Sequence, residues 1–154
     1  MKNRNIPNNI HWRTPVHVKR WIIEKFGYYF DPCPFYANFD GLKVKWKEFN
    51  YVNPGFDLKT KTAFVKKAIA EMIVNNSISL VNIPFTCETD LFHKYIYRYA
   101  SRVYIPNKRI KYAGFNSKGI YTKDNSGQQG TVFVLFDGLK TDTRQMPEFE
   151  IIKF

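Results

Sequence analysis

The sequence predicts an α/β fold with an open, mostly parallel sheet and antiparallel strands at its edges. Up to residue 105, short apolar runs alternate with segments of helical periodicity, as in strand–helix–strand units. Beyond residue 105 strand-like segments dominate, which predicts the antiparallel edge strands. A length of 154 residues favours one domain over 1–154, with a flexible N-terminus at 1–10 and a mobile loop at 116–130.

Local signals set the predicted elements. Thr14 is a suitable N-cap, Pro15 suits the first helical position, and Gly27 suits the end of a helix. In chain order, the other predicted elements are a strand at 28–30, an irregular segment at 35–49, a strand at 50–52, a helix at 58–75, a strand at 77–83, a helix at 88–100, and strands at 102–105, 109–112, 131–136 and 148–152.

The chain carries a formal net charge of +11, so it is expected to attract polyanions, of which nucleic acid is the commonest. Lys108, Arg109 and Lys111 cluster after a predicted strand, with Tyr112 and Phe115 between and after them. The cations suit phosphates and the rings suit exposed bases. The alternative is a solvated strand edge that its charges protect against pairing.

Several classes of protein are disfavoured. No apolar run approaches the roughly 20 residues that cross a bilayer, and the polar start is unlike a signal peptide, so a cytoplasmic location and no membrane partner are expected. Cys33 and Cys87 form no CxxC pair and the three histidines are dispersed, which disfavours a disulfide scaffold and a metal site.

The segment Asn53-Pro54-Gly55-Phe56 carries the most specific chemistry. A short strand delivers Asn53 to its carboxyl end, where open α/β sheets bind their ligands. The Asn53 carboxamide oxygen and the Pro54 carbonyl are two hydrogen-bond acceptors for an amino group, and Phe56 is an aromatic surface for a planar base. The alternative is an ordinary turn in which Phe56 packs into the core.

Four features in order resemble the small phage-type DNA N6-adenine methyltransferases, which are Dam-like. The first three are His11-Trp12-Arg13-Thr14-Pro15, Phe30-Asp31-Pro32-Cys33, and Trp46 followed by Tyr51 to Phe56. The fourth runs from Val81-Asn82-Ile83-Pro84 through Thr89 and Phe92 to Lys108-Arg109-Ile110-Lys111-Tyr112. Together they cover residues 11 to about 115.

The resemblance implies a reduced Rossmann-like class I methyltransferase fold, S-adenosylmethionine as methyl donor, and DNA with a flipped adenine as substrate in a bacterial or virus-infected cell. It implies that Asn53 and Pro54 bind the adenine amine while Phe56 stacks on its ring. The cofactor-binding residues that it implies are Trp12, Thr14, Pro15, Asp31, Pro32 and Asn53, and the nucleic-acid-binding residues expected are Lys108, Arg109 and Lys111.

Two departures from the family pattern bear on activity. Gly55 stands where the family has a second proline, which loosens the loop, and a GxGxxG cofactor loop is missing. Phe35 and Tyr36 are candidates for adenosine recognition, with core packing as the alternative. Altered or slower catalysis is expected. The alternative functions are a catalytically impaired module that binds DNA or a partner, and methylation of cytosine N4 or of RNA.

Overall fold

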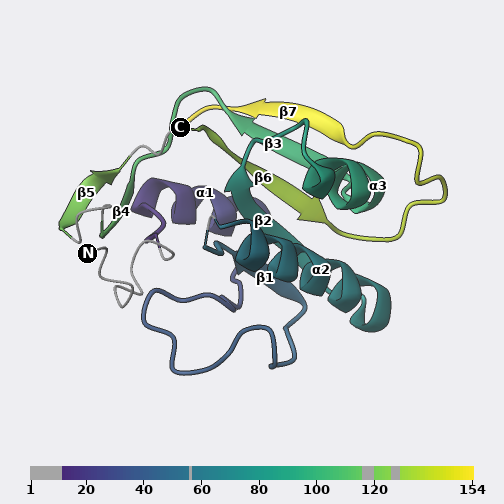
Figure 1. The fold of residues 1–154 in the computed structure, drawn as a ribbon, viewed down its shortest axis with the longest axis horizontal. Helices are drawn as coiled ribbons and strands as arrows, with labels where there is room; N and C mark the ends of the chain where they lie inside the picture. The colour runs from purple at the N-terminus through teal and green to yellow at the C-terminus, as the bar shows by residue number, and fades with distance from the viewer. Residues whose placement is uncertain (1–11, 56, 116–119, 126–128) are drawn as a thin grey trace.

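The computed structural model describes residues 12–55, 57–115, 120–125 and 129–154. A five-stranded sheet with the strand order β1-β2-β6-β3-β7 forms its centre (Figure 1). In sheet order these strands are β1 (Phe49–Val52), β2 (Ile78–Pro84), β6 (Thr131–Phe136), β3 (Arg102–Pro106) and β7 (Glu148–Ile152). A separate hairpin contains β4 (Tyr112–Phe115) and β5 (Tyr121–Asn125).

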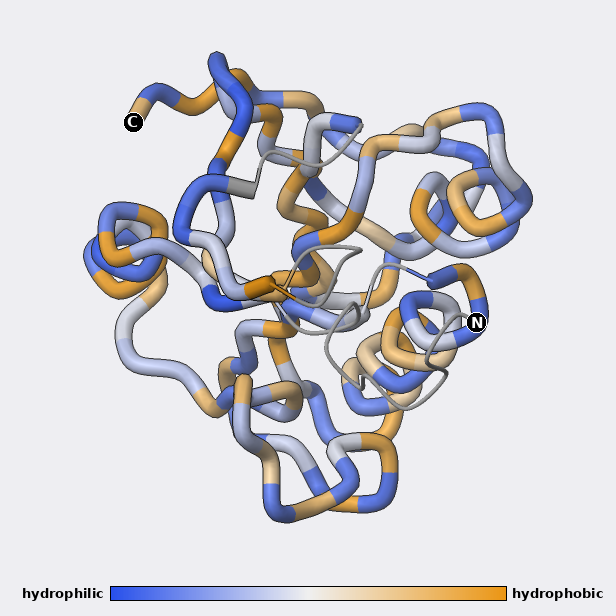
Figure 2. The backbone as a smooth tube through the Cα atoms, turned by 60° about the vertical axis from the view of Figure 1, so that its left-hand side comes forward, coloured by the Kyte–Doolittle hydropathy of each residue, from blue (hydrophilic) through white to orange (hydrophobic). Residues whose placement is uncertain are grey.

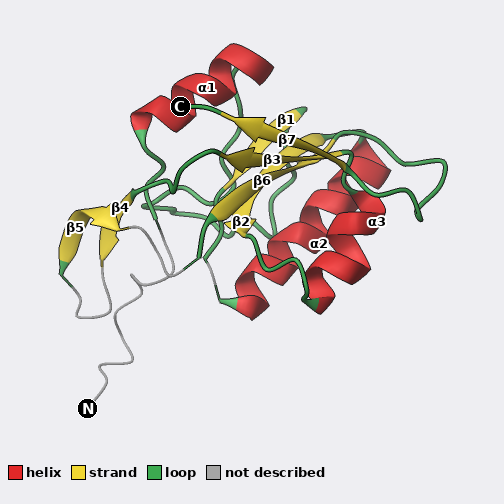
Figure 3. Ribbon diagram, turned by 90° about the horizontal axis from the view of Figure 1, so that it is seen from above, coloured by secondary structure: helices red, strands yellow, loops and turns green. Residues whose placement is uncertain are grey.

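Helices cover both faces of the sheet (Figure 3). Helix α1 (Val16–Phe26) lies on one face, and α2 (Leu58–Asn75) lies on the other with the π-helical turn η2 (Phe92–Ile96) and α3 (Tyr97–Tyr99). Strand β6 shows why both faces need cover, since Val132 and Val134 belong to the core beneath α2 while Phe133 belongs to the core beneath α1. In Figure 2 the helices carry hydrophobic residues on one side and hydrophilic residues on the other.

The sheet is mixed and mostly parallel, but the predicted antiparallel edges are wrong. The edge strands β1 and β7 run parallel to their neighbours β2 and β3. The reversed strand is β6, which pairs antiparallel with both β2 and β3 in the middle of the sheet. All six residues of β6 are buried, so its continuous apolar run fits a central strand. The position of β6 between β2 and β3 depends on long-range strand pairing, which no local sequence pattern specifies.

The first predicted helix is confirmed, but its predicted N-cap is not. Helix α1 is followed by Gly27, whose φ of 89° is accessible to glycine and whose N–H donates to the Ile23 carbonyl at 2.8 Å. At the other end Pro15 occupies the N-cap position without a side-chain cap. Thr14 lies one residue too early, and its hydroxyl pairs with Tyr51 instead.

The predicted strand at 28–30 is reduced to one bridge between Phe30 and Asn50. The Phe30 N–H donates to the Phe49 carbonyl and the Tyr51 N–H donates to the Phe30 carbonyl, each at 3.0 Å. The segment continues into Asp31 and Pro32, and proline has no N–H with which to extend the ladder. Even so, Phe30 lies parallel to β1 on its outer side, so Asp31 emerges at the carboxyl edge of the sheet.

The end of the chain differs from the prediction in two places. The strand expected at 109–112 lies at 112–115 as β4, and β5 occupies 121–125 inside the segment predicted as a loop. Pairing between these two strands supplies the backbone hydrogen bonds that neither segment makes alone. The rest of that predicted loop at 116–119 and 126–128, the predicted flexible N-terminus at 1–10, and Phe56 lie outside the described residues.

Candidate functional site

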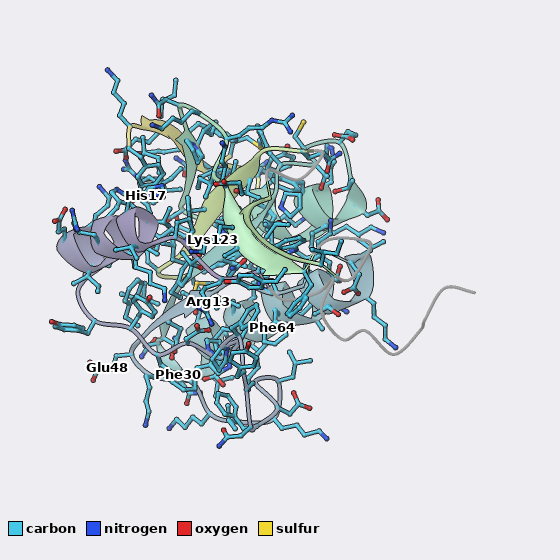
Figure 4. All side chains as sticks on the ribbon, turned by 90° about the vertical axis from the view of Figure 1, so that its left-hand side faces the viewer. Arg13, His17, Phe30, Glu48, Phe64 and Lys123 are labelled. Atoms are coloured by element: carbon cyan, nitrogen blue, oxygen red, sulfur yellow. The ribbon has the colours of Figure 1, made fainter. Side chains whose placement is uncertain are left out.

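The candidate site lies at the carboxyl edge of the sheet, where β1, β2 and β3 end. Asn53 directly follows β1, Asp31 follows the Phe30 bridge beside it, and Phe85 follows β2. This edge faces the viewer in Figure 4, in which Arg13 lies near the centre. Arg13 is placed there because its N–H donates to the Ala113 carbonyl at 2.8 Å, which joins the segment before α1 to β4.

Asn53 is held in one orientation and retains an unpaired acceptor. Its side chain is 4% exposed, and Nδ2 donates to the Trp12 carbonyl at 2.6 Å and to Thr14 Oγ1 at 3.2 Å. Because a backbone carbonyl can only accept, the Trp12 contact decides which end of the carboxamide is nitrogen. Oδ1 therefore points away from Trp12, and it is buried without a hydrogen-bond partner among the described residues. An unpaired buried acceptor costs about 1–3 kcal/mol, which a donor from a ligand would recover.

A buried polar network leads from Asn53 into the sheet. Thr14 Oγ1 lies 3.0 Å from Tyr51 Oη, to which Asn82 Nδ2 donates at 3.3 Å. Asn82 Nδ2 also donates to Tyr112 Oη at 2.6 Å, and Tyr112 Oη lies 2.8 Å from Thr131 Oγ1. Burial raises the pKa of Tyr112 to about 12 and raises that of Tyr51 well above its usual value, so both phenols stay protonated.

Asp31 is a half-buried carboxylate beside this network. Burial raises its pKa to about 6, against the opposing effects of the Cys33 N–H, which donates to Oδ1 at 2.8 Å, and of the Lys19 charge. The negative charge of Asp31 also contributes to the raised pKa of Tyr51, after the larger effects of burial and of Tyr112. A cationic or hydroxyl-bearing ligand would stabilise the ionised form, which burial alone disfavours.

A cavity of about 690 Å³ joins two of the sequence-predicted segments. Pro32 and Cys33 line it from the Phe30 side, Gly55 lines it from the segment after β1, and Phe64 of α2 closes it. Gly41 shapes the wall, because a Cβ at this position would lie 1.9 Å from the Pro32 carbonyl oxygen. The irregular segment 35–49 therefore packs directly on the segment that contains Asp31.

The predicted basic residues lie at the other end of the same edge. Lys108 and Arg109 line a cavity of about 480 Å³ with Phe85 and Thr131, and they also line a second cavity of about 470 Å³ with Lys111 and Pro15. The expectation that Tyr112 stacks on bases is wrong. Tyr112 is 3% exposed, because its ring packs beneath α1 and its hydroxyl belongs to the buried network.

The other aromatic candidates have local partners. The Arg13 guanidinium lies 4.8 Å from the centre of the Phe35 ring, which also packs edge-on against Tyr36 at 4.6 Å. Tyr36 is exposed, and Trp12 is half-buried, with its carbonyl bonded to Asn53. Phe35 is thus engaged in a cation–π contact, while the exposed Tyr36 ring can still accept a stacking partner.

Sequence reasoning missed the residues that orient the site. It identified Asn53, Thr14 and Asp31, and the structure joins the first two by a hydrogen bond. It did not identify Tyr51 or the roles of Asn82 and Thr131, which complete the network. One signal was present, since Asn82 interrupts the apolar run from Leu80 to Ile83 in a buried strand, and a buried carboxamide requires hydrogen-bond partners.

The fold and site define the class of protein as an α/β protein with a mixed, mostly parallel five-stranded sheet and a polar carboxyl edge. Comparison with models of protein families, with curated protein sequences and with solved structures finds no match to this chain.

Within the described residues no group of three or more histidine, cysteine or acidic side chains is arranged to hold a metal ion. No helix in that part of the chain is long and apolar enough to cross a membrane.

Proposed function

We propose that this protein is an S-adenosylmethionine-dependent methyltransferase that acts on the exocyclic N6 amine of adenine in DNA, with a reduced Rossmann-like class I fold. The observation that carries the proposal is the Asn53 carboxamide, whose nitrogen is tied to Trp12 and Thr14 while its buried oxygen lacks a partner. Such an oxygen is a preorganised acceptor for an amino group, because it needs no rearrangement before it binds a donor.

In this proposal, Asn53 and Pro54 orient the amino group of the target adenine. One amine hydrogen donates to Asn53 Oδ1 and the other donates to the Pro54 carbonyl. Two such hydrogen bonds hold the nitrogen so that its lone pair faces away from both acceptors. Phe56, which lies outside the described residues, is assigned to the ring of the base by resemblance alone.

The residues at the edge of the sheet are compatible with the methyl donor. When bound, S-adenosylmethionine supplies an electrophilic methyl group attached to a sulfonium. The half-buried Asp31 carboxylate suits an ammonium group or ribose hydroxyls, and the next two residues in the chain, Pro32 and Cys33, line the cavity of about 690 Å³. Thr14 and the Trp12 carbonyl are already bonded to Asn53, so their proposed part is to position that side chain.

DNA is the proposed substrate because of charge and position. The net charge of +11 favours a polyanion, and Lys108, Arg109 and Lys111 line cavities at the same edge as Asn53. A base inside a duplex cannot reach a carboxamide that is only 4% exposed, so the target adenine has to leave the stack.

The decisive experiment measures transfer of a labelled methyl group from S-adenosylmethionine to DNA. We expect transfer by the unchanged protein and a loss of at least about a hundredfold in Asn53→Ala, because small misplacements of a reacting group already cost that much. Asn75→Ala is the matched control, since this asparagine bonds to Glu71 at the end of α2. Mass spectrometry of the digested nucleic acid then distinguishes N6-methyladenine from N4-methylcytosine, and DNA from RNA. Absence of cofactor binding by calorimetry would falsify the proposal.

A catalytically impaired DNA- or partner-binding module is the second candidate, and Gly55 is the observation that favours it. Gly55 is buried in the wall of the cavity at the position where the resembled family has a proline. A looser loop would leave the acceptors less well placed. This candidate predicts salt-dependent DNA binding without methyl incorporation. A rise of activity in Gly55→Pro would count against it.

A further inference from the structure

A basic cavity at the start of α1 brings together parts of the chain that are far apart in sequence. Its volume is about 470 Å³. Figure 4 shows His17 of α1 and Lys123 of β5 on the edge that also carries Arg13. The lining residues are Pro15 and His17 from the start of α1, Lys108, Arg109 and Lys111 from the segment before β4, Lys123 and Asp124 from β5, and Phe154.

The charge in this cavity is unbalanced. Four permanent cations, which are Lys108, Arg109, Lys111 and Lys123, face a single carboxylate from Asp124. Among the described residues none of the three lysines forms an ion pair, whereas Lys67, Lys94 and Arg102 elsewhere all do. Like charges in one cavity repel each other, so an anion that enters it is favoured by every one of them.

Two further observations indicate which anion fits. The cavity is linked to the proposed amine acceptor through the chain, since Pro15 lines it and the preceding residue Thr14 bonds to Asn53 at 3.2 Å. In addition, Lys108 and Arg109 also line the adjacent cavity beside Thr131, so the positive surface continues along the carboxyl edge. Cations that line two adjacent cavities suit a polynucleotide, which carries a charge at every phosphate, better than a single small anion.

We infer that this cavity binds a backbone phosphate of the nucleotide chain next to the target base, with Lys111 and Lys123 as its principal cations. The inference rests on the proposed function for the identity of the substrate, and it adds Lys123 and the hairpin β4–β5 to the binding surface. Lys111 directly precedes β4 and Lys123 belongs to β5, so both halves of the hairpin contribute a cation to the cavity.

The test is equilibrium binding of a fluorescent single-stranded oligonucleotide over a range of salt concentrations, without a methyl donor. The double variant Lys111→Ala/Lys123→Ala is compared with Lys45→Ala/Lys47→Ala, which removes the same charge from exposed lysines ahead of β1, at the opposite edge. We expect the first variant to bind about tenfold more weakly at low salt, with a salt slope reduced by about 1 to 2, and the second to change little. Equal losses in both variants overturn the inference.

A second measurement uses the unchanged protein. An amine-acetylating reagent is applied with and without the oligonucleotide, and the modification of each lysine is quantified by mass spectrometry. Protection of Lys111 and Lys123, but not of Lys45 and Lys47, supports the site, and uniform protection contradicts it. Neither measurement needs catalysis, so the two proposals can fail separately. If the protein binds the oligonucleotide in this way but transfers no methyl group, the phosphate site stands and the proposed function fails. If the protein methylates DNA but Lys111→Ala/Lys123→Ala leaves the salt slope unchanged, the phosphate site fails and the proposed function stands.

Discussion

Asn53 Nδ2 donates a hydrogen bond to Thr14 Oγ1 at 3.2 Å, although the two residues are 39 positions apart. This contact, with the 2.6 Å bond from Asn53 to the Trp12 carbonyl, ties the segment before α1 to the carboxyl end of β1. The orientation of the proposed amine acceptor therefore depends on residues that precede α1, and changes at Thr14 are expected to act through Asn53.

Thr14→Val should lower both stability and methyl transfer. Valine keeps the shape of threonine but removes the hydroxyl that bonds to Asn53 and Tyr51. We expect the free energy of unfolding to fall by about 1–3 kcal/mol, the cost of leaving buried polar groups unpaired, as measured by urea titration. Transfer should fall more than DNA binding, and Thr14→Ser should preserve both. An unchanged rate in Thr14→Val would show that Asn53 does not need this partner.

Tyr112→Phe tests the inner part of the network. The phenol accepts from Asn82 at 2.6 Å and pairs with Thr131 at 2.8 Å, and all three residues are buried. Removal of the hydroxyl should cost about 1–3 kcal/mol in the free energy of unfolding. Tyr121→Phe, in the exposed partner strand β5, is the control and should change stability by less than about 0.5 kcal/mol. Equal effects of the two substitutions would contradict a structural role for the network.

Asp31→Asn should change how stability depends on pH. Burial raises the folded-state pKa of Asp31 to about 6, from 3.8 in the unfolded chain. Between about pH 4 and pH 6 the folded protein therefore holds a proton that the unfolded chain has released, so the stability of the unchanged protein falls as the pH rises through this window.

Above pH 6 the unchanged protein bears the full cost of the buried charge. Asparagine cannot ionise and can still accept from the Cys33 N–H. Asp31→Asn should therefore be more stable by up to about 3 kcal/mol at pH 7.5, with little difference at pH 4, by urea titration at several pH values. If Asp31 binds the cofactor, calorimetry should show weaker binding in this more stable variant. A constant stability difference across the pH range would contradict the raised pKa.

Gly41→Ala should disturb the cavity lined by Pro32 and Cys33. The added Cβ would lie 1.9 Å from the Pro32 carbonyl oxygen, which is backbone and cannot rotate away. We expect a loss of about 1–3 kcal/mol in the free energy of unfolding and weaker cofactor binding. Gly130→Ala is the control, since nothing lies within 4 Å of the new atom there. If both glycines tolerate alanine equally, the close approach of Gly41 to Pro32 is not required.

Much of the local structure could be predicted from sequence because its signals are local. Helix α2 begins at Leu58 and ends at Asn75 as its periodicity indicates, and β6 covers the predicted residues 131–136. The Asp57 side chain accepts from the Thr60 N–H at 2.9 Å, a capping contact between near neighbours. Asn53 was likewise placed after a strand because Pro54 prevents the strand from continuing.

By itself, then, the sequence determined the α/β class, most element positions, the positive charge and the placement of Asn53 after β1. Only the tertiary structure decided that β6 enters the centre of the sheet, that 121–125 pairs as a strand, and that Thr14 bonds to Asn53 rather than capping α1. The physical reason is the distance along the chain over which each kind of interaction acts. Periodicity, caps and proline act over a few residues, whereas strand insertion and buried polar pairing depend on partners tens of positions away, which compete for the same donors and acceptors only once the chain has folded.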